Sequence, residues 1–250
     1  MRRLAVTAAF ALAALSVVVA VAAAGTRTNV IYDSTAKNGP PSNMPSLGAE
    51  AYAFASLGDE VAFASGPRKL STVTVTLSSW ACVQGTWFNG DCVTPTGATF
   101  SLPLTLNIYD DTGTTLLASS TQTFAVPYRP SASARCGDGR WYSNPLKTCF
   151  NGFADDVTFG FGGNVTLPDT VVYELSYNTS HYGPSPVGEG AACFGTEAGC
   201  PYDSLNIALN TSTSAGTDVF SGDVWQNGAR TTIYDSSYTP AVQFKASGGS

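Results

Sequence analysis

Residues 70–80 read LSTVTVTLSSW, and this stretch decides the fold class. Val73, Val75 and Leu77 alternate with threonines, so the side chains repeat with a period of two. That period is typical of a β-strand with one face toward a core and the other toward solvent. The stretch therefore predicts a half-buried strand ending near Trp80.

The same alternation recurs along the chain. SLPLTLNIY (101–109) places Leu102, Leu104, Leu106 and Ile108 on one face, and Pro103 on the other face indicates an edge position or a strand start. Further strands are expected in TTLLASSTQTFAV, DVTFGF, TVVYELSY, SLNIAL and AVQFKA. DDTG (110–113) predicts a turn. Short strands, many turn residues and little helical patterning predict an all-β protein, a single jelly-roll-like β-sandwich with disulfide-stapled loops.

The N-terminus has the pattern of an export signal. Arg2 and Arg3 precede an apolar run, and small residues at Ala22 and Ala24 predict cleavage before Gly25. We therefore expect a signal-peptide helix over 1–24, one β-sandwich domain over 25–250, and a secreted, extracellular product. Retention of the apolar run as a membrane anchor is the alternative, because it is long enough to span a bilayer.

Charge limits the partners. Without Arg2 and Arg3 the chain has ten basic and eighteen acidic side chains, a net charge of about −8. Nucleic acids and anionic membrane surfaces bind basic patches, so neither is an expected partner of the mature protein.

Six cysteines occupy the mature chain in three short brackets. An exported protein with an even cysteine count is expected to form disulfides. Zinc sites need closer cysteine pairs or several histidines, and His181 is the single histidine of the chain. The short separations favour sequential pairing, which gives Cys82–Cys92, Cys136–Cys149 and Cys193–Cys200. No metal site is predicted from these residues.

Catalytic patterns are weak. There is no G-x-S-x-G elbow, and His181 follows a strand in a turn-like context. The adjacent acids Asp59-Glu60, Asp110-Asp111 and Asp155-Asp156 should point to opposite faces of an extended chain, and are interpreted as turn or strand-end residues. Asp110, Asp111, Asp155 and Asp156 are the places where a structural calcium ion is conceivable; no other cofactor is expected.

Aromatic residues on the bracketed loops suggest a binding surface. Trp87 lies inside the first bracket, Trp141 inside the second beside Arg140 and Tyr142, and Tyr182 follows His181. Rings on polar loops provide large contact areas for glycans or proteins; the alternative is that each ring packs on its own loop. Strand directions predict that the three brackets lie at one pole of the sandwich. The predicted ligand-binding residues are Trp87, Arg140, Trp141, His181 and Tyr182.

Several segments carry a family resemblance. They include SLGAEAYAFASLGDEVAFA, VTVTLSSWAC, PLTLNIY, QTFAVPYRPSASARC, CFNGFADDVTFGF, VTLPDTVVYELSYNTSHYGPSPVG, YDSLNIALN and YTPAVQFKA. Together they resemble a family of secreted bacterial β-sandwich proteins with no assigned activity. The resemblance implies an extracellular all-β domain and brings no catalytic residues.

Three classes of function follow from these observations. The first is a secreted non-catalytic binding, adhesion or extracellular-matrix module that contacts a glycan or a protein surface through its loop rim. The alternatives are an extracellular glycan-active enzyme with paired carboxylates and a purely structural surface protein. A cleft with two facing carboxylates would favour the enzyme.

Overall fold

The computed structural model describes residues 28–36, 44–52, 54–177, 205–233 and 237–248. The expected signal sequence (1–24) lies outside the described residues. Within them the protein is all-β, with antiparallel strands and a single helical turn, α1 (Ala49–Tyr52). The predicted all-β class is therefore confirmed.

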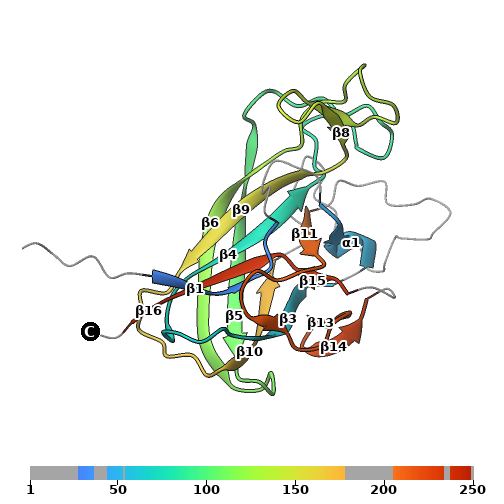
Figure 1. Ribbon diagram of the computed structural model, residues 1–250. Helices are drawn as coiled ribbons and strands as arrows, with labels where there is room; N and C mark the ends of the chain where they lie inside the picture. The colour runs from blue at the N-terminus through green and yellow to red at the C-terminus, as the bar shows by residue number, and fades with distance from the viewer. Residues whose placement is uncertain (1–27, 37–43, 53, 178–204, 234–236, 249–250) are drawn as a thin grey trace, which may run out of the picture.

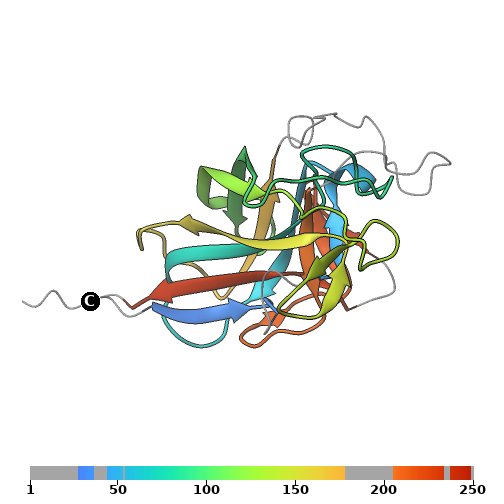
Figure 2. The same cartoon turned by 90° about the horizontal axis from the view of Figure 1, so that it is seen from above.

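Two seven-stranded sheets make up most of the structure (Figures 1 and 2). The first has the strand order β1 (Thr28–Asp33), β16 (Val242–Ser247), β4 (Lys69–Ser79), β11 (Leu205–Asn210) and β15 (Thr239–Pro240). In addition, β2 (Ser46–Gly48) pairs with β11, and β9 (Phe153–Gly160) pairs with β4.

The second sheet has the order β14 (Ala229–Thr232), β13 (Asp223–Gln226), β3 (Ser56–Ala62), β10 (Thr170–Ser176), β5 (Thr99–Tyr109) and β6 (Leu116–Pro127). The short strand β12 (Thr217–Asp218) pairs with β3. A separate hairpin joins β7 (Trp141–Ser143) to β8 (Thr148–Phe150).

The alternating residues face inward as predicted. Val73, Val75 and Leu77 of β4 are at most 1% exposed, and the β5 side chains at 102, 104, 106 and 108 are equally buried. Pro103 is exposed and pairs only with Thr123 of β6, because the pairing of β5 with β10 begins at Thr105. Its missing N–H therefore interrupts no ladder on the second side of the strand.

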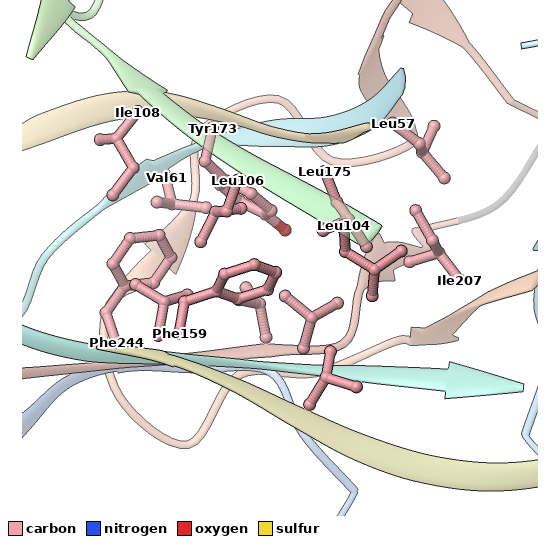
Figure 3. Close-up of a cluster of buried hydrophobic side chains, with 14 of the residues drawn as sticks. Leu57, Val61, Leu104, Leu106, Ile108, Phe159, Tyr173, Leu175, Ile207 and Phe244 are labelled. Atoms are coloured by element: carbon pink, nitrogen blue, oxygen red, sulfur yellow. The ribbon is translucent and has the colours of Figure 1, made fainter. Parts of the chain in front are cut away.

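The main apolar core lies between the two sheets. Figure 3 shows Phe159 and Phe244 of the first sheet opposite Val61, Leu106 and Tyr173 of the second. The rings of Tyr173 and Phe244 meet edge-on, with centroids 5.5 Å apart. Burial of this shared face joins the sheets, since apolar area removed from water is the main favourable contribution to folding.

The strand directions bring several chain ends together. Ser79, at the end of β4, pairs with Phe153, at the start of β9, and Thr99 of β5 pairs with Pro127 of β6. The loops 80–98 and 128–152 therefore leave the sheets at the same pole, the upper end of Figure 1.

Candidate functional site

The loops 80–98 and 128–152 form one structure, called here the stapled cap. Each contains a disulfide, Cys82–Cys92 in the first and Cys136–Cys149 in the second, with Cα atoms 5.5 and 5.9 Å apart. These are two of the three predicted pairs. Cys193 and Cys200 lie outside the described residues.

Backbone hydrogen bonds join the two loops. Arg129 N donates to Ala81 O at 2.9 Å, and Ala132 N donates to Cys92 O at 2.9 Å. The buried Arg129 guanidinium donates to Gly139 O at 2.7 Å, which ties the start of the second loop to its own disulfide bracket. The two brackets are therefore held as one unit, as expected from the strand directions.

A groove of about 620 Å³ runs between the two loops. Residues 94–98 form one wall. Pro127, Tyr128 and residues 130–134 form the other, and Tyr142 and Phe153 join the two. Ser131 fixes the walls to each other, because its hydroxyl accepts from Thr94 N at 2.8 Å and donates to Thr94 O at 3.1 Å. The groove is therefore set by the fold before any ligand arrives.

The groove has neutral, aromatic and hydroxyl-bearing walls. Tyr128, Tyr142 and Phe153 contribute half-buried rings, and the remaining described residues that line it are Pro, Thr, Ser, Ala and Gly. Tyr128 packs on Phe100 with centroids 4.9 Å apart. The Arg135 guanidinium lies 5.2 Å from the centre of the Tyr142 ring, at the edge of the site. These groups can stack on a flat apolar face and exchange hydrogen bonds.

Trp141 has a structural position. It is 4% exposed, its indole N–H donates to Gly152 O at 2.8 Å, and it packs against Phe150 and Phe153. In the hairpin β7–β8, successive side chains alternate in direction, so Trp141 points inward and Tyr142 outward. Burial therefore corrects the prediction that Trp141 offers its ring to a ligand.

The other predicted residues have different positions. Trp87 is half-buried and meets Trp80 edge-on at 4.7 Å. Arg140 donates to Gly137 O and pairs with Asp138 at 3.9 Å. Both belong to the stapled cap, but neither lines the groove. His181 and Tyr182 lie outside the described residues.

Sequence reasoning missed Tyr128 and Phe153 and treated Tyr142 as a mere neighbour of Trp141. The sequence did contain a signal for Tyr142. If residues 141–143 form a strand, Trp141 and Tyr142 point to opposite faces, so only one of the two rings can be buried. Tyr128 and Phe153 carried no such signal, since they follow β6 and begin β9, and only the meeting of these strand ends makes them adjacent to one groove.

The adjacent acids occupy three different places in the fold. Asp110 closes the β5–β6 turn by accepting from Thr112, Thr114 and Thr115, and these bonds lower its pKa. Asp155 and Asp156 lie within β9 rather than at its end, and Asp156 accepts from Thr76 at 2.7 Å. Across the described ranges no three His, Cys, Asp or Glu side chains gather in a metal-binding group.

Asp59 and Glu60 do point to opposite faces, as predicted, but they lie in the middle of β3 and not at a turn. Glu60 pairs with Arg230 at 2.6 Å, whereas Asp59 is 2% exposed on the core-facing side with Leu57 and Val61. The position of Asp59 thus differs from the interpretation as a strand-end residue. A carboxylate enclosed in this way cannot touch a polymeric substrate.

No helix in the described part of the chain is long and apolar enough to cross a bilayer. Comparison of the chain with protein-family models, curated proteins and solved structures gave no match.

Proposed function

We propose that this protein is a secreted, non-catalytic binding module, a single jelly-roll-like β-sandwich domain that holds an extracellular glycan in the groove of the stapled cap. The observation that carries the proposal is the uncharged, aromatic and hydroxyl-lined groove between two disulfide-held loops.

The chemistry of the groove suits a neutral sugar. The apolar face of a sugar ring can stack on Tyr142 or Tyr128, while the phenol groups and the hydroxyl-bearing walls exchange hydrogen bonds with its hydroxyls. A preformed groove loses little conformational entropy when the ligand binds, and the two disulfides serve this preorganisation.

A glycan screen with the purified mature protein tests the proposal. Tyr142→Ala should lower affinity for any retained neutral glycan at least tenfold, because the half-buried ring that points into the groove is removed while the inward Trp141 stays in place. Phe88→Ala is the matched control, since Phe88 is a 47% exposed aromatic of the same cap outside the groove. Retention of no neutral glycan, or equal binding by wild type and Tyr142→Ala, would contradict the proposal.

A protein partner is the second candidate. Three apolar side chains of the cap are strongly exposed: Phe88, Val93 and Leu146 at 46–54%. Exposed apolar surface is typical of protein–protein contacts where it is contiguous, and these three side chains belong to the two loops of one cap. In this case Phe88→Ala and Leu146→Ala would weaken binding to a captured partner, whereas Tyr142→Ala would have less effect.

Export is part of the proposal. The apolar N-terminus supports it, and the two disulfides are consistent with an oxidising, extracellular environment. We expect N-terminal sequencing of exported protein to begin at Gly25 or within a few residues of it. A mature form that still carries residues 4–24 would indicate a membrane anchor instead.

A further inference from the structure

Arg135 lies at the edge of the groove in the stapled cap, next to the ring of Tyr142. The second disulfide brings the two together. Tyr142 lies directly across from Cys149 in the hairpin β7–β8, and Cys149 is bonded to Cys136, the residue after Arg135. Residues 133 and 134, immediately before Arg135, line the groove. The cation and the groove are therefore parts of one stapled structure.

The guanidinium of Arg135 is oriented, and most of its donors are available to a ligand. Its Cζ lies over the Tyr142 ring, 5.2 Å from the ring centre, and its Nη1 donates to Asn144 Oδ1 at 3.3 Å. The residue is exposed, and within the described part of the chain its guanidinium makes no second hydrogen bond. A guanidinium has five N–H donors in a planar fork that matches two oxygens of one anionic group.

Arg135 also lacks a counter-ion within the described ranges. The cations of the ion pairs formed there are Arg68, Arg140 and Arg230. Arg140, in the same cysteine bracket, lies 3.9 Å from the carboxylate of Asp138. The charge of Arg140 is thus partly compensated by the protein itself, whereas the charge of Arg135 is not.

The charge of the stapled cap is opposite to that of the whole chain. The chain has 12 basic and 18 acidic side chains and a net charge of −6. The loops 80–98 and 128–152 nevertheless contain four basic residues and only two acidic ones, namely Arg129, Arg135, Arg140 and Lys147 against Asp91 and Asp138. The cap is therefore the electropositive pole of an acidic protein, which favours the approach of an anion to this end of the molecule.

We propose that the glycan held by the stapled cap is acidic, with a neutral sugar stacked in the groove and a carboxylate or sulfate of an adjoining sugar bound by Arg135. This inference rests on the proposed function and specifies its ligand. The uncharged walls of the groove offer no compensation for a buried anion, so the anionic group belongs at the edge, beside Arg135. Charge-assisted hydrogen bonds to a guanidinium are roughly twice as strong as neutral ones, so this contact should select among glycans.

Matched pairs of glycans test the proposal. Oligosaccharides of hyaluronan and glucuronoxylan, which combine neutral and carboxylate-bearing sugars, are compared with their carboxyl-reduced forms, and carrageenan oligosaccharides are compared with their desulfated forms. In calorimetric titrations at low salt, the mature wild-type protein should bind at least one charged form about tenfold more tightly than its neutral counterpart. This preference should decrease as NaCl is added, because salt screens the charge of Arg135.

Three variants separate the role of Arg135 from that of the overall charge. Arg135→Gln should lose the preference for the charged form while its binding of the neutral form is unchanged. Arg135→Lys should keep only part of the preference, because an ammonium group lacks the planar fork. Arg140→Gln is the matched control and should keep the preference, since it removes the same charge from the same bracket but from a cation that pairs with Asp138. Circular dichroism confirms that each variant is folded.

The possible results distinguish this inference from the proposed function. Equal binding of charged and neutral forms by the wild type, or a preference that Arg135→Gln retains, would overturn the acidic ligand and leave the neutral-sugar groove in place. Binding of polyphosphate as tightly as the charged glycans would also overturn it, because simple charge attraction would then be sufficient. Retention of charged forms alone, with no effect of Tyr142→Ala, would contradict the groove of the proposed function and this inference with it.

Discussion

Asp59 projects from β3 into the space between the sheets, flanked on its own strand by Leu57 and Val61. A carboxylate at such a position is unfavourable when ionised unless hydrogen bonds or charges compensate. Two donors, Glu60 N and the Thr239 hydroxyl, provide part of this compensation. Burial first, and then the charges of Asp218 and Glu60, nevertheless raise the pKa of Asp59.

Replacement of Asp59 by Asn should change the pH dependence of stability. Because the pKa of Asp59 is raised in the folded protein, the wild type loses stability as pH rises from about 4 toward that pKa, by at most about 1.4 kcal/mol per pH unit. Asp59→Asn removes this loss and keeps a hydrogen-bonding amide. Urea unfolding at pH 4, 6 and 8 should show that the unfolding free energy of the variant increases relative to that of the wild type as pH rises.

The sign of this effect is the critical result. A difference in unfolding free energy that stays constant between pH 4 and 8 would mean that Asp59 has an ordinary pKa. If the unfolding free energy of the variant instead falls relative to the wild type as pH rises, Asp59 is stabilised as a carboxylate in the folded protein.

At the scale of elements, the loops 80–98 and 128–152 depend on close backbone contact. Gly90 and Gly139 meet where the two disulfide brackets touch, and a Cβ at Gly139 would overlap the Gly90 backbone. Gly139 also has a φ of 65°, in the left-handed region that favours glycine. The stapled cap therefore requires glycine at this contact for two reasons.

Gly139→Ala should separate these two reasons when compared with Gly97→Ala. Gly97 has a similar φ of 77°, but a Cβ there would meet no atom within 4 Å. We expect Gly97→Ala to cost about 1–2 kcal/mol from backbone conformation alone, and Gly139→Ala to cost clearly more. Urea unfolding measures the cost, and near-ultraviolet circular dichroism of the cap tryptophans reports the displacement of the loops.

Equal destabilisation by the two substitutions would contradict the close packing of Gly90 and Gly139. In that case the contact between the brackets would be loose enough to accept a methyl group.

At the scale of the whole molecule, the main core and the stapled cap are separate packing units. Members of the main hydrophobic cluster come from the two sheets and the segments that flank them, and none comes from 80–98 or 128–152. Within the cap, Cys82, Cys92 and Trp141 are buried, although they do not belong to the main hydrophobic cluster. The disulfides therefore stabilise a region that the main core does not cover.

Removal of either cap disulfide should affect the cap more than the sheets. Cys136→Ser/Cys149→Ser, or Cys82→Ser/Cys92→Ser, should lower the stability of the cap by about 3 kcal/mol. Limited proteolysis should then cut within 80–98 and 128–152, while far-ultraviolet circular dichroism keeps its strand signal. Complete unfolding of the sheets in either double variant would show instead that cap and core fold as one cooperative unit.

The sequence by itself determined the all-β class, the inward faces of β4, β5, β9 and β10, the DDTG turn and the two cap disulfides that the structure describes. These features depend on local periodicity and short separations, which a single sequence displays directly. Strand directions inferred from the sequence also predicted that the first two cysteine brackets lie at the same pole, as the structure shows.

Only the tertiary structure decided which residues form the candidate sites. Tyr128, Tyr142 and Phe153 reach one groove because three strand ends meet, and Trp141 turns inward because its hairpin packs on Gly152 and Phe153. Asp59 meets Thr239 across 180 residues of chain. Such contacts arise because the two sheets bury a shared core. Periodicity along one strand shows which of its faces is buried, but not which distant segment packs against that face.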